Sequence, residues 1–298
     1  MKFSNPTARK TFRRCPKRFH YRYFYRPESA SDLSAHRRRL QLCGIRELAG
    51  DFIHRTIAKM VRAIADGDHS WDYAKASQEC WDEFSLVVAK SLAAEPGQLI
   101  GGLQLAETYN GLTPAEIKDD VNHWRGLIPV AIETAFRTAH ELQIRHATST
   151  YSVEAEKEIM WTDNGMPMRF IIDVLTQSPS QTVVIDWKTH EIDNADVFQI
   201  RNYLRWLHKV VKVPSSKLFG FAVNLRTGEC VEVNYNPYRF NQRSTTATAR
   251  DPRLETEGGK DLNSPSPHPE LCQSCAYATL CPDSALAGPL PISRLNHN

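Results

Sequence analysis

The sequence lacks several features that would decide its class at once. It has no run of about 18 consecutive apolar residues, so no segment could form a membrane-spanning helix. The first 26 residues are basic but contain neither an apolar h-region nor a small-residue cleavage site, which argues against a secretory signal. The P-loop motif G-x4-G-K-[ST] is absent, so any ATP-driven unwinding of a nucleic acid would need another protein. We therefore expect a cytoplasmic protein that does not contact a membrane.

Acidic residues are nearly absent from the beginning of the chain. None precedes Glu28, and residues 1–62 hold 16 Lys and Arg against 4 Asp and Glu. The other 236 residues hold 21 against 30, so the formal net charge of +3 hides a basic segment and an acidic remainder. Residues 2–26 interleave nine basic with seven aromatic residues, which suits phosphate pairing together with base stacking. The alternative is an arm whose aromatic rings pack on the body and whose charges are only solvated.

The composition is that of a globular protein, and its periodicity changes near Ser152. With 298 residues, 41% hydrophobic and 24% charged, the chain can form one large domain or two small ones. The predicted helices are 36–65 with a break near Gly44, 71–95, and 113–147 with a kink or break at Pro129. The later predicted elements are strands 153–162, 167–176 and 181–189, a helix 194–211, and strands 217–226 and 229–235.

This order of strands and helix predicts an α/β or α+β sheet domain that follows a mostly helical first half. Residues 241–269 are rich in Thr, Ser, Pro and charge, as expected for a connector. We divide the chain into a basic arm (1–34), a helical region (35–151), a sheet core (152–240), a linker (241–269) and a cysteine-rich C-terminal segment (270–298).

Two carboxylates and an ammonium group are predicted at the ends of adjacent strands. Asp173 ends one strand, and Asp186-Trp187-Lys188 ends the next. Hard cations such as Mg²⁺ and Mn²⁺ need oxygen ligands, and a nearby lysine can orient or help deprotonate an attacking water. This is the chemistry of phosphodiester hydrolysis. The alternative is that these are ordinary surface charges at strand ends.

Other polar residues are predicted near these strand ends. Gln199 and Tyr203 are four residues apart on the helix after Asp186, so both project from one face. His54 lies among apolar residues on an early helix, where it is either a ligand or a core histidine. Glu158, on the strand before Asp173, is a candidate for an additional carboxylate near the metal.

Seven cysteines, an odd number, favour thiols or metal ligands over disulfides. Cys272, Cys275 and Cys281 have the spacing C-x2-C-x5-C, which leaves one tetrahedral position open. The candidates for the fourth ligand are Cys15, Cys43, Cys80 and Cys230. Cys15 stands out because its surroundings are polar and basic, whereas the others fall on apolar helix faces or in a strand and are expected in the core. Zinc and an iron-sulfur cluster both fit this spacing.

Together these residues resemble the RecB-like branch of the PD-(D/E)XK nuclease superfamily, and within it the iron-sulfur nucleases, such as CRISPR-associated RecB-like exonucleases and AddB-type nucleases. The matching pieces, in the family's order, are Cys15-Pro16 followed by Arg18-Phe19 and Tyr21, Gly50 with His54, Asp173, Asp186-x-Lys188, Gln199-x3-Tyr203, and Cys272-x2-Cys275-x5-Cys281. One departure is the segment before Asp173, residues 169–172, where such families often place a glycine.

The resemblance implies a restriction-endonuclease-like mixed sheet flanked by helices, with an iron-sulfur module that joins the termini. It implies a DNA exonuclease that favours single strands, in repair, CRISPR adaptation or phage defence. The implied ligands of Mg²⁺ or Mn²⁺ are His54, Asp173, Asp186 and the carbonyl of Trp187. Lys188 would position the water, and Gln199 and Tyr203 would brace the site or touch the phosphate. The implied ligands of a 4Fe-4S cluster are Cys15, Cys272, Cys275 and Cys281.

Two other interpretations stay open at this point. The chain could be a DNA-binding subunit whose nuclease site depends on a helicase or integrase partner. It could also be a structural or regulatory protein held together by zinc. Cleavage by the isolated chain would separate the first from an independent nuclease, and a brown colour in anaerobic preparations would exclude zinc as the main occupant.

Overall fold

The structure is a computed structural model that describes residues 11, 14–25, 29–68, 70–141, 152–163, 166–237, 269–281 and 284. It divides into unit 1 (residues 1–9, 50–80 and 126–254) and unit 2 (residues 10–49, 81–125 and 255–298). The predicted linker lies outside the described residues except at Pro269, and so does the predicted continuation of a helix to residue 147. The five-part division of the chain therefore stays a prediction.

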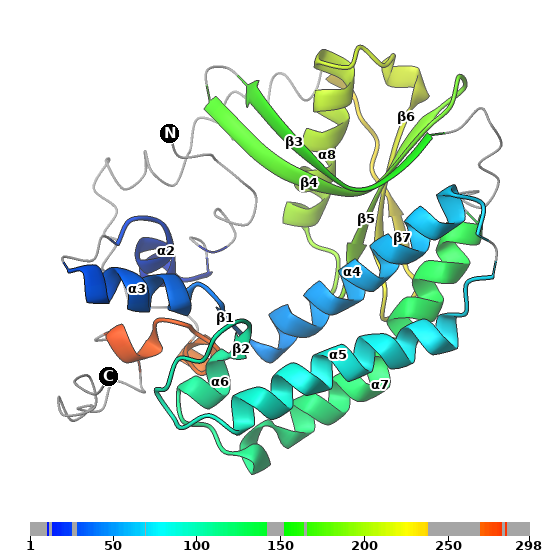
Figure 1. Cartoon of the computed structure of the whole chain (residues 1–298). Helices are drawn as coiled ribbons and strands as arrows, with labels where there is room; N and C mark the ends of the chain where they lie inside the picture. Colours follow the sequence, from blue (N-terminus) through cyan, green and yellow to red (C-terminus); the bar gives the residue numbers. More distant parts are fainter. Residues whose placement is uncertain are drawn as a thin grey trace. The chain divides into compact units, whose positions relative to one another are not determined.

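Unit 1 is built on a mixed five-stranded sheet (Figure 1). In spatial order its strands are β3 (Ser152–Asp163), β4 (Met166–Gln177), β5 (Thr182–Lys188), β6 (Leu218–Asn224) and β7 (Cys230–Glu232). The β5–β6 pair is parallel and the other pairs are antiparallel. Helix α8 (Asn194–Lys209) connects the parallel pair. The predicted order of three strands, a helix and two strands is the order observed, and the mixed α/β class is confirmed.

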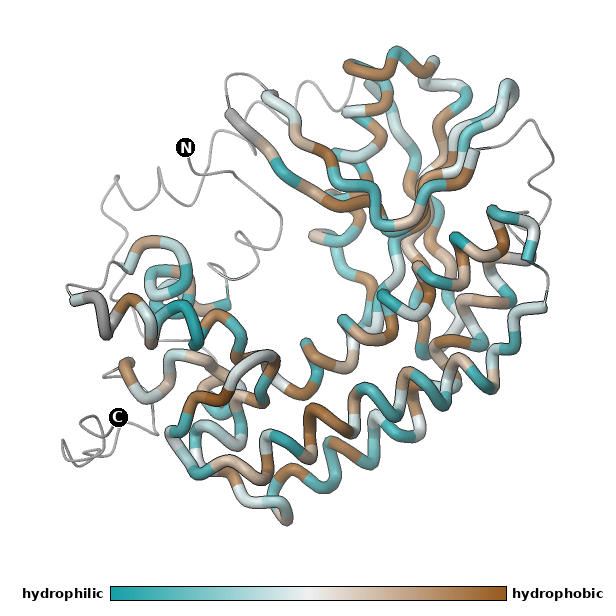
Figure 2. Tube along the Cα trace, in the orientation of Figure 1, coloured by the Kyte–Doolittle hydropathy of each residue, from teal (hydrophilic) through white to brown (hydrophobic). Residues whose placement is uncertain are grey.

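Helix α8 covers one face of this sheet. Its N-terminus is fixed by a capping box between Asp193 and Asp196, which supplies acceptors for N–H groups that lack helical partners. Its buried face packs on β4, β5 and β6. Gly220 on β6 makes this approach possible, because a Cβ there would come within 2.6 Å of Ile200 Cγ2. Figure 2 shows that hydrophobic and hydrophilic residues alternate along the helices and strands.

Besides α8, unit 1 contains parts of three longer helices. They are α4 (Ile45–Ala65), α5 (Tyr73–Leu92) and α7 (Pro114–Glu141). Their apolar residues recur at helical spacing and are buried, as Ile53, Ile57 and Val61 of α4 illustrate. Helix α7 continues through Pro129 without ending. Because proline has no backbone N–H, the helical hydrogen bond from position 129 to the carbonyl of Arg125 is absent.

Unit 2 contains short elements around a small core. They are α2 (Pro16–Tyr23), α3 (Ala30–Arg39), α6 (Ala106–Tyr109), the 3₁₀ turns η3 (Pro269–Cys272) and η4 (Ala278–Leu280), and a parallel pair of β1 (Leu42–Cys43) with β2 (Gln104–Leu105). The core joins Leu42, Ala106 and Tyr109 with Cys275 and Tyr277 of the C-terminal segment. Among the described residues, no helix is both long and apolar enough to cross a membrane.

Candidate metal centre and cysteine site

Asp173 and Asp186 lie where β4 and β5 separate. The prediction that Asp173 ends a strand is wrong, because β4 continues to Gln177 and only its pairing with β5 stops next to Asp173. The two strands pair from Gln177 opposite Thr182 to Val174 opposite Ile185, and the next position on each strand is an aspartate. The backbone N–H of Trp187 donates to Asp173 Oδ2 over 2.8 Å, in place of a regular ladder bond. The end of the ladder therefore holds two carboxylates side by side.

A buried polar network extends from Asp186 toward α8. Lys188 forms an ion pair with Asp186 Oδ2 and donates to Gln199 Oε1 over 3.3 Å. The amide nitrogen of Gln199 donates to Asp186 Oδ1 over 3.2 Å and to the hydroxyl of Tyr203. Gln199 thus links the carboxylate of Asp186, the ammonium group of Lys188 and the phenol of Tyr203. The four-residue spacing of Gln199 and Tyr203 predicts that these two side chains share a helix face.

His54 approaches the same place from α4. Its Nδ1 lies 3.4 Å from Asp173 Oδ2, and its side chain is 30% exposed. The side chain of Asp173 is 16% exposed, whereas that of Asp186 is 1% exposed. His54 is therefore not a core histidine, and solvent reaches the pair that it forms with Asp173.

The charges of the two aspartates are balanced unequally. Burial and the neighbouring Asp173 charge raise the pKa of Asp186 to about 6, although Lys188 opposes the shift. Burial would also raise the pKa of Asp173, but His54 and Lys188 outweigh it, so that this pKa is lowered. Burial disfavours the ammonium form of Lys188, yet the carboxylates around it raise its pKa overall. The ammonium form is the one that the network holds.

Asp196 also belongs to this network, although it is not among the site residues predicted from the sequence. Its Oδ1 lies 3.5 Å from Lys188 Nζ, and its Oδ2 lies 3.1 Å from His190 Nε2. The same Oδ2 accepts the backbone N–H of Asp193 over 3.1 Å as part of the capping box. The spacing Asp193-x-x-Asp196 at the start of a predicted helix is the signal that could have identified it.

The chemistry of this site fits a divalent cation. Within the described residues no three His, Cys, Asp or Glu side chains are arranged to hold a metal as they stand. The available donors are nevertheless hard oxygens and an imidazole, which suit Mg²⁺ or Mn²⁺. Burial, together with the charge of Asp173, raises the pKa of Asp186, and a cation bound by the two carboxylates would offset both effects. Glu158, the further candidate, instead pairs with Arg169.

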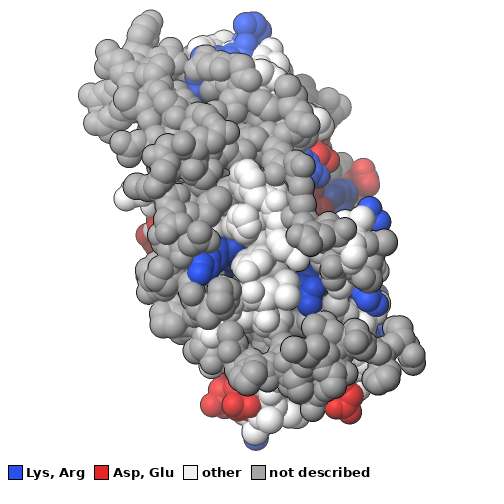
Figure 3. All heavy atoms as spheres, turned by 90° about the vertical axis from the view of Figure 1, so that its left-hand side faces the viewer, with Lys and Arg blue, Asp and Glu red and all other residues white. Residues whose placement is uncertain are grey.

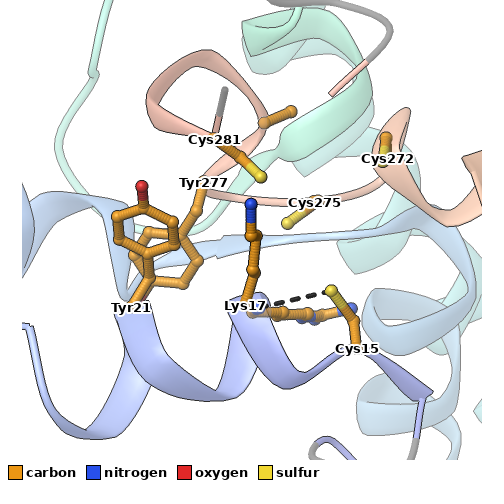
Figure 4. Close-up of a pocket in the computed structure, with 9 residues that line it drawn as sticks. Cys15, Lys17, Tyr21, Cys272, Cys275, Tyr277 and Cys281 are labelled. Carbon is orange, nitrogen blue, oxygen red and sulfur yellow. Dashed lines mark hydrogen bonds between the residues drawn. The ribbon is translucent and has the colours of Figure 1, made fainter. Parts of the chain in front are cut away.

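Four cysteines from the two ends of the chain line one pocket in unit 2 (Figure 4). Cys15 is the N-cap of α2, and its Sγ accepts the backbone N–H of Arg18 over 3.3 Å. Cys272, Cys275 and Cys281 face it from the C-terminal segment. These are the four cysteines that the resemblance selects.

Cations and aromatic rings surround this pocket. Lys17 and Arg18 are among its lining residues, and Lys17 points among the sulfur atoms in Figure 4. Tyr21 stacks on Tyr277 with a ring-centroid distance of 5.6 Å. Burial, reinforced by Cys15 and Cys272, raises the pKa of Cys275 to about 11, although Arg18 opposes the shift. Without a bound metal Cys275 is therefore a neutral thiol.

The other three cysteines are not at this pocket. Cys80 is buried on α5, as expected. Cys43 belongs to strand β1 rather than to a helix and is half-buried. The expectation that Cys230 lies in the core is wrong, because Cys230 is exposed. The reason is that β7 is a three-residue strand at the edge of the described sheet, where β6 is its one neighbour.

Of the comparisons with known proteins, the family model is the one that identifies a family. No curated protein matches the chain. A solved structure titled "Crystal structure of SSO0001" is 17% identical, with a TM-score of 0.28 and coverage of 57% of this chain and 79% of that chain. The family model of the PD-(D/E)XK nuclease superfamily matches residues 4–282. The chain therefore belongs to the PD-(D/E)XK nuclease superfamily, whose members are metal-dependent nucleases.

Proposed function

We propose that this nuclease hydrolyses DNA with Mg²⁺ or Mn²⁺ held by His54, Asp173, Asp186 and the main-chain carbonyl of Trp187. One observation carries the proposal: Asp173 and Asp186 lie at the point where β4 and β5 separate, with His54 3.4 Å from Asp173. The bound cation would activate water and stabilise the negative charge that develops on the phosphate. No covalent intermediate with the protein is required.

Hydrogen bonds hold the catalytic groups in fixed positions, and they involve Lys188, Gln199 and Tyr203. Lys188 offers N–H donors that can orient the attacking water, and its carboxylate partners keep it positively charged. Gln199 fixes the direction of both Lys188 and Asp186 through its amide group. Tyr203 braces Gln199 from the next turn of α8. A group held in this way needs little reorganisation during the reaction.

We further propose a RecB-like exonuclease that prefers single-stranded DNA. The support is the basic and aromatic character of the N-terminal segment, where the exposed Arg14 and the half-buried Arg22 and Tyr23 belong to the described residues. Figure 3 shows exposed Lys and Arg atoms in several separate places on the face that it draws. Arginines contact phosphates and aromatic rings stack on unpaired bases. A helicase or integrase partner would belong to this proposal as a source of single strands.

The proposed second cofactor is a 4Fe-4S cluster held by Cys15, Cys272, Cys275 and Cys281. The donor set fits, because four thiols line one pocket beside Lys17 and Arg18, whose charges would offset the anionic thiolates. When bound, the cluster would act mainly as a structural cross-link between the two ends of the chain. Zinc is the alternative occupant, and absorbance near 400 nm in an anaerobic preparation would separate the two.

The first prediction tests the nuclease site. Anaerobically purified protein should degrade 5′- and 3′-labelled single-stranded DNA in the presence of Mn²⁺. Asp186→Asn and Lys188→Ala should lower kcat by at least about 100-fold, because each removes a charge at the reacting phosphate. Lys118→Ala is the matched control, since Lys118 is an exposed lysine on α7. Labelled products show the polarity, and thermal unfolding shows that each variant is folded.

The outcomes separate the alternatives. Full activity in folded Lys188→Ala would refute the assignment of this site. Binding of DNA without cleavage by the wild-type chain would instead favour a subunit that depends on a partner.

A further inference from the structure

The hairpin of β3 and β4 extends beyond the rest of the sheet (Figure 1). The two strands pair along their full length, from Ser152 opposite Gln177 to Asp163 opposite Met166. In contrast, β4 pairs with β5 only over residues 174–177. Residues 157–163 and 166–172 therefore form a two-stranded arm, which we call the hairpin arm.

One face of the hairpin arm is covered and the other is open. Phe170 and Ile172 belong to the core, and the ring of Phe170 lies 4.9 Å from that of Tyr203 on α8. Side chains alternate between the two faces of a strand. Arg169 and Ile171 therefore point to the opposite face, and both are exposed.

The open face carries two large apolar side chains. Met160 is 63% exposed and Ile171 is 45% exposed. The register sets Met160 opposite Arg169 and Glu158 opposite Ile171, so these four residues form one surface, which we call the hairpin patch. Within it Arg169 forms an ion pair with Glu158.

The hairpin patch is continuous with the metal centre. Asp173 follows Ile171 by two residues on β4, a distance of about 7 Å along a strand. Next to this end of the arm, Glu156 of β3 forms an ion pair with Arg62 of α4 over 3.0 Å. A polymer bound with its phosphate at Asp173 and continuing along β4 would therefore pass directly over the patch.

We propose that the hairpin patch holds the single-stranded nucleic acid next to the scissile phosphate, an inference that rests on the proposed function. Unpaired bases have open faces that gain from contact with Met160 and Ile171, whereas duplex bases are already stacked. On binding, Arg169 leaves its ion pair with Glu158 and forms one with a phosphate of the nucleic acid. This exchange is easy because both side chains of the pair are about half exposed, and such exposed pairs are weak. The patch therefore determines the preference for single strands.

The test compares two matched surface substitutions in the full chain. The double variant Met160→Ser/Ile171→Ser should raise the KM for a single-stranded oligonucleotide by about 5- to 20-fold, with kcat within about twofold of wild type. Val210→Ser, 48% exposed at the C-cap of α8, is the control and should leave both constants unchanged. Cleavage of duplex DNA should respond much less to the double variant.

A second readout measures binding without cleavage. In the Lys188→Ala background, fluorescence anisotropy should show the same loss of affinity for single-stranded DNA. Arg169→Gln should reduce the slope of log K against log salt by about 0.7, the value for one phosphate contact on a single strand.

An unchanged KM and affinity in the double variant would overturn the proposal and would favour a protein as the occupant of the patch. An equal loss on single- and double-stranded DNA would overturn it as well. If the wild type cleaves no nucleic acid, the proposed function fails, and the anisotropy measurement still decides whether the patch binds single strands.

Discussion

Lys188 is surrounded by groups that fix both its charge and its direction. Asp186 pairs with it, Gln199 accepts one of its N–H bonds, and Asp196 lies 3.5 Å from its nitrogen. A lysine in water would instead sample many rotamers. The sequence identifies Lys188 from its position two residues after Asp186, but it does not reveal that Asp196 helps to hold it.

At the residue scale we predict a positioning role for Asp196. Asp196→Asn should lower kcat by roughly 10- to 100-fold and leave the KM for DNA within about twofold, because it loosens Lys188 without touching the substrate. The asparagine oxygen can still accept the N–H of Asp193, so the start of α8 should remain intact. Steady-state kinetics and thermal unfolding provide the measurement.

Asp196→Glu restores the charge and is the matched variant, so it should recover part of the lost kcat. A rise in KM with unchanged kcat in Asp196→Asn would contradict the positioning role.

At the scale of elements, α4 begins on a buried carboxyl group. Glu107 Oε1 accepts the backbone N–H of Ile45 over 2.9 Å, and its Oε2 is buried and accepts no hydrogen bond. Burial raises the pKa of Glu107 from 4.5 to about 7, although the bond from Ile45 opposes the shift. The helix that carries His54 therefore starts on a group that prefers to be protonated.

The pH dependence of stability follows from the sign of this shift. Because the folded protein binds the proton more tightly, the contribution of Glu107 to stability declines as pH rises from 4.5 to about 7. Glu107→Gln keeps the acceptor but cannot ionise, so it should raise the free energy of unfolding at pH 8 by roughly 1–3 kcal/mol. Denaturant unfolding between pH 4.5 and 8 measures it.

Glu116→Gln is the matched control for this experiment. Glu116 is exposed, and its bonds from Thr113 lower its pKa, so its contribution is lost only below pH 4.5. A pH profile of Glu107→Gln as steep as that of the wild type would contradict the assignment.

Local pattern predicted the longer elements and missed the short ones: α2, β1, β2, α6 and the 3₁₀ turns were not predicted, and the helix predicted over 36–65 is divided into α3 and α4 by β1. Runs of strand-forming residues between turn residues identified the strands of unit 1, and helical patterns identified α4, α5, α7 and α8. Helix α2 was missed because basic residues dominate its sequence, although Pro16 at its first turn was a usable signal. Its stability comes from contacts such as the stack of Tyr21 on Tyr277, which lies 256 residues away in the sequence.

At the scale of the whole molecule, the four-cysteine pocket joins two distant parts of the chain. Cys15 and Cys272 are 257 residues apart in the sequence. A cross-link across so long a loop removes roughly 5 kcal/mol of chain entropy from the unfolded state, by analogy with disulfides. A bound cluster would therefore stabilise the molecule far more than local contacts of α2 alone.

Removal of one proposed ligand tests this role. Cys15→Ser should lose most of the bound iron and lower the temperature of unfolding, because the loop is then open. Cys230→Ser is the control, since Cys230 is exposed on β7 and is not at the pocket. Iron analysis and calorimetry on anaerobic protein give the result, and full iron retention in Cys15→Ser would transfer the fourth ligand to another residue.

Neighbouring residues encode the order of the longer strands and helices, the basic segment 1–62 with the acidic remainder, and the short motifs around Asp186 and Cys272, so the sequence alone was enough to predict them. Tertiary packing brings His54 to Asp173 across 119 residues, and it places Cys15, rather than Cys43, Cys80 or Cys230, at the pocket with the other three cysteines. It also decided that Ile171 stays uncovered beside Asp173. The physical reason is that periodicity specifies which residues share a face, whereas strand register and packing between elements specify what that face meets.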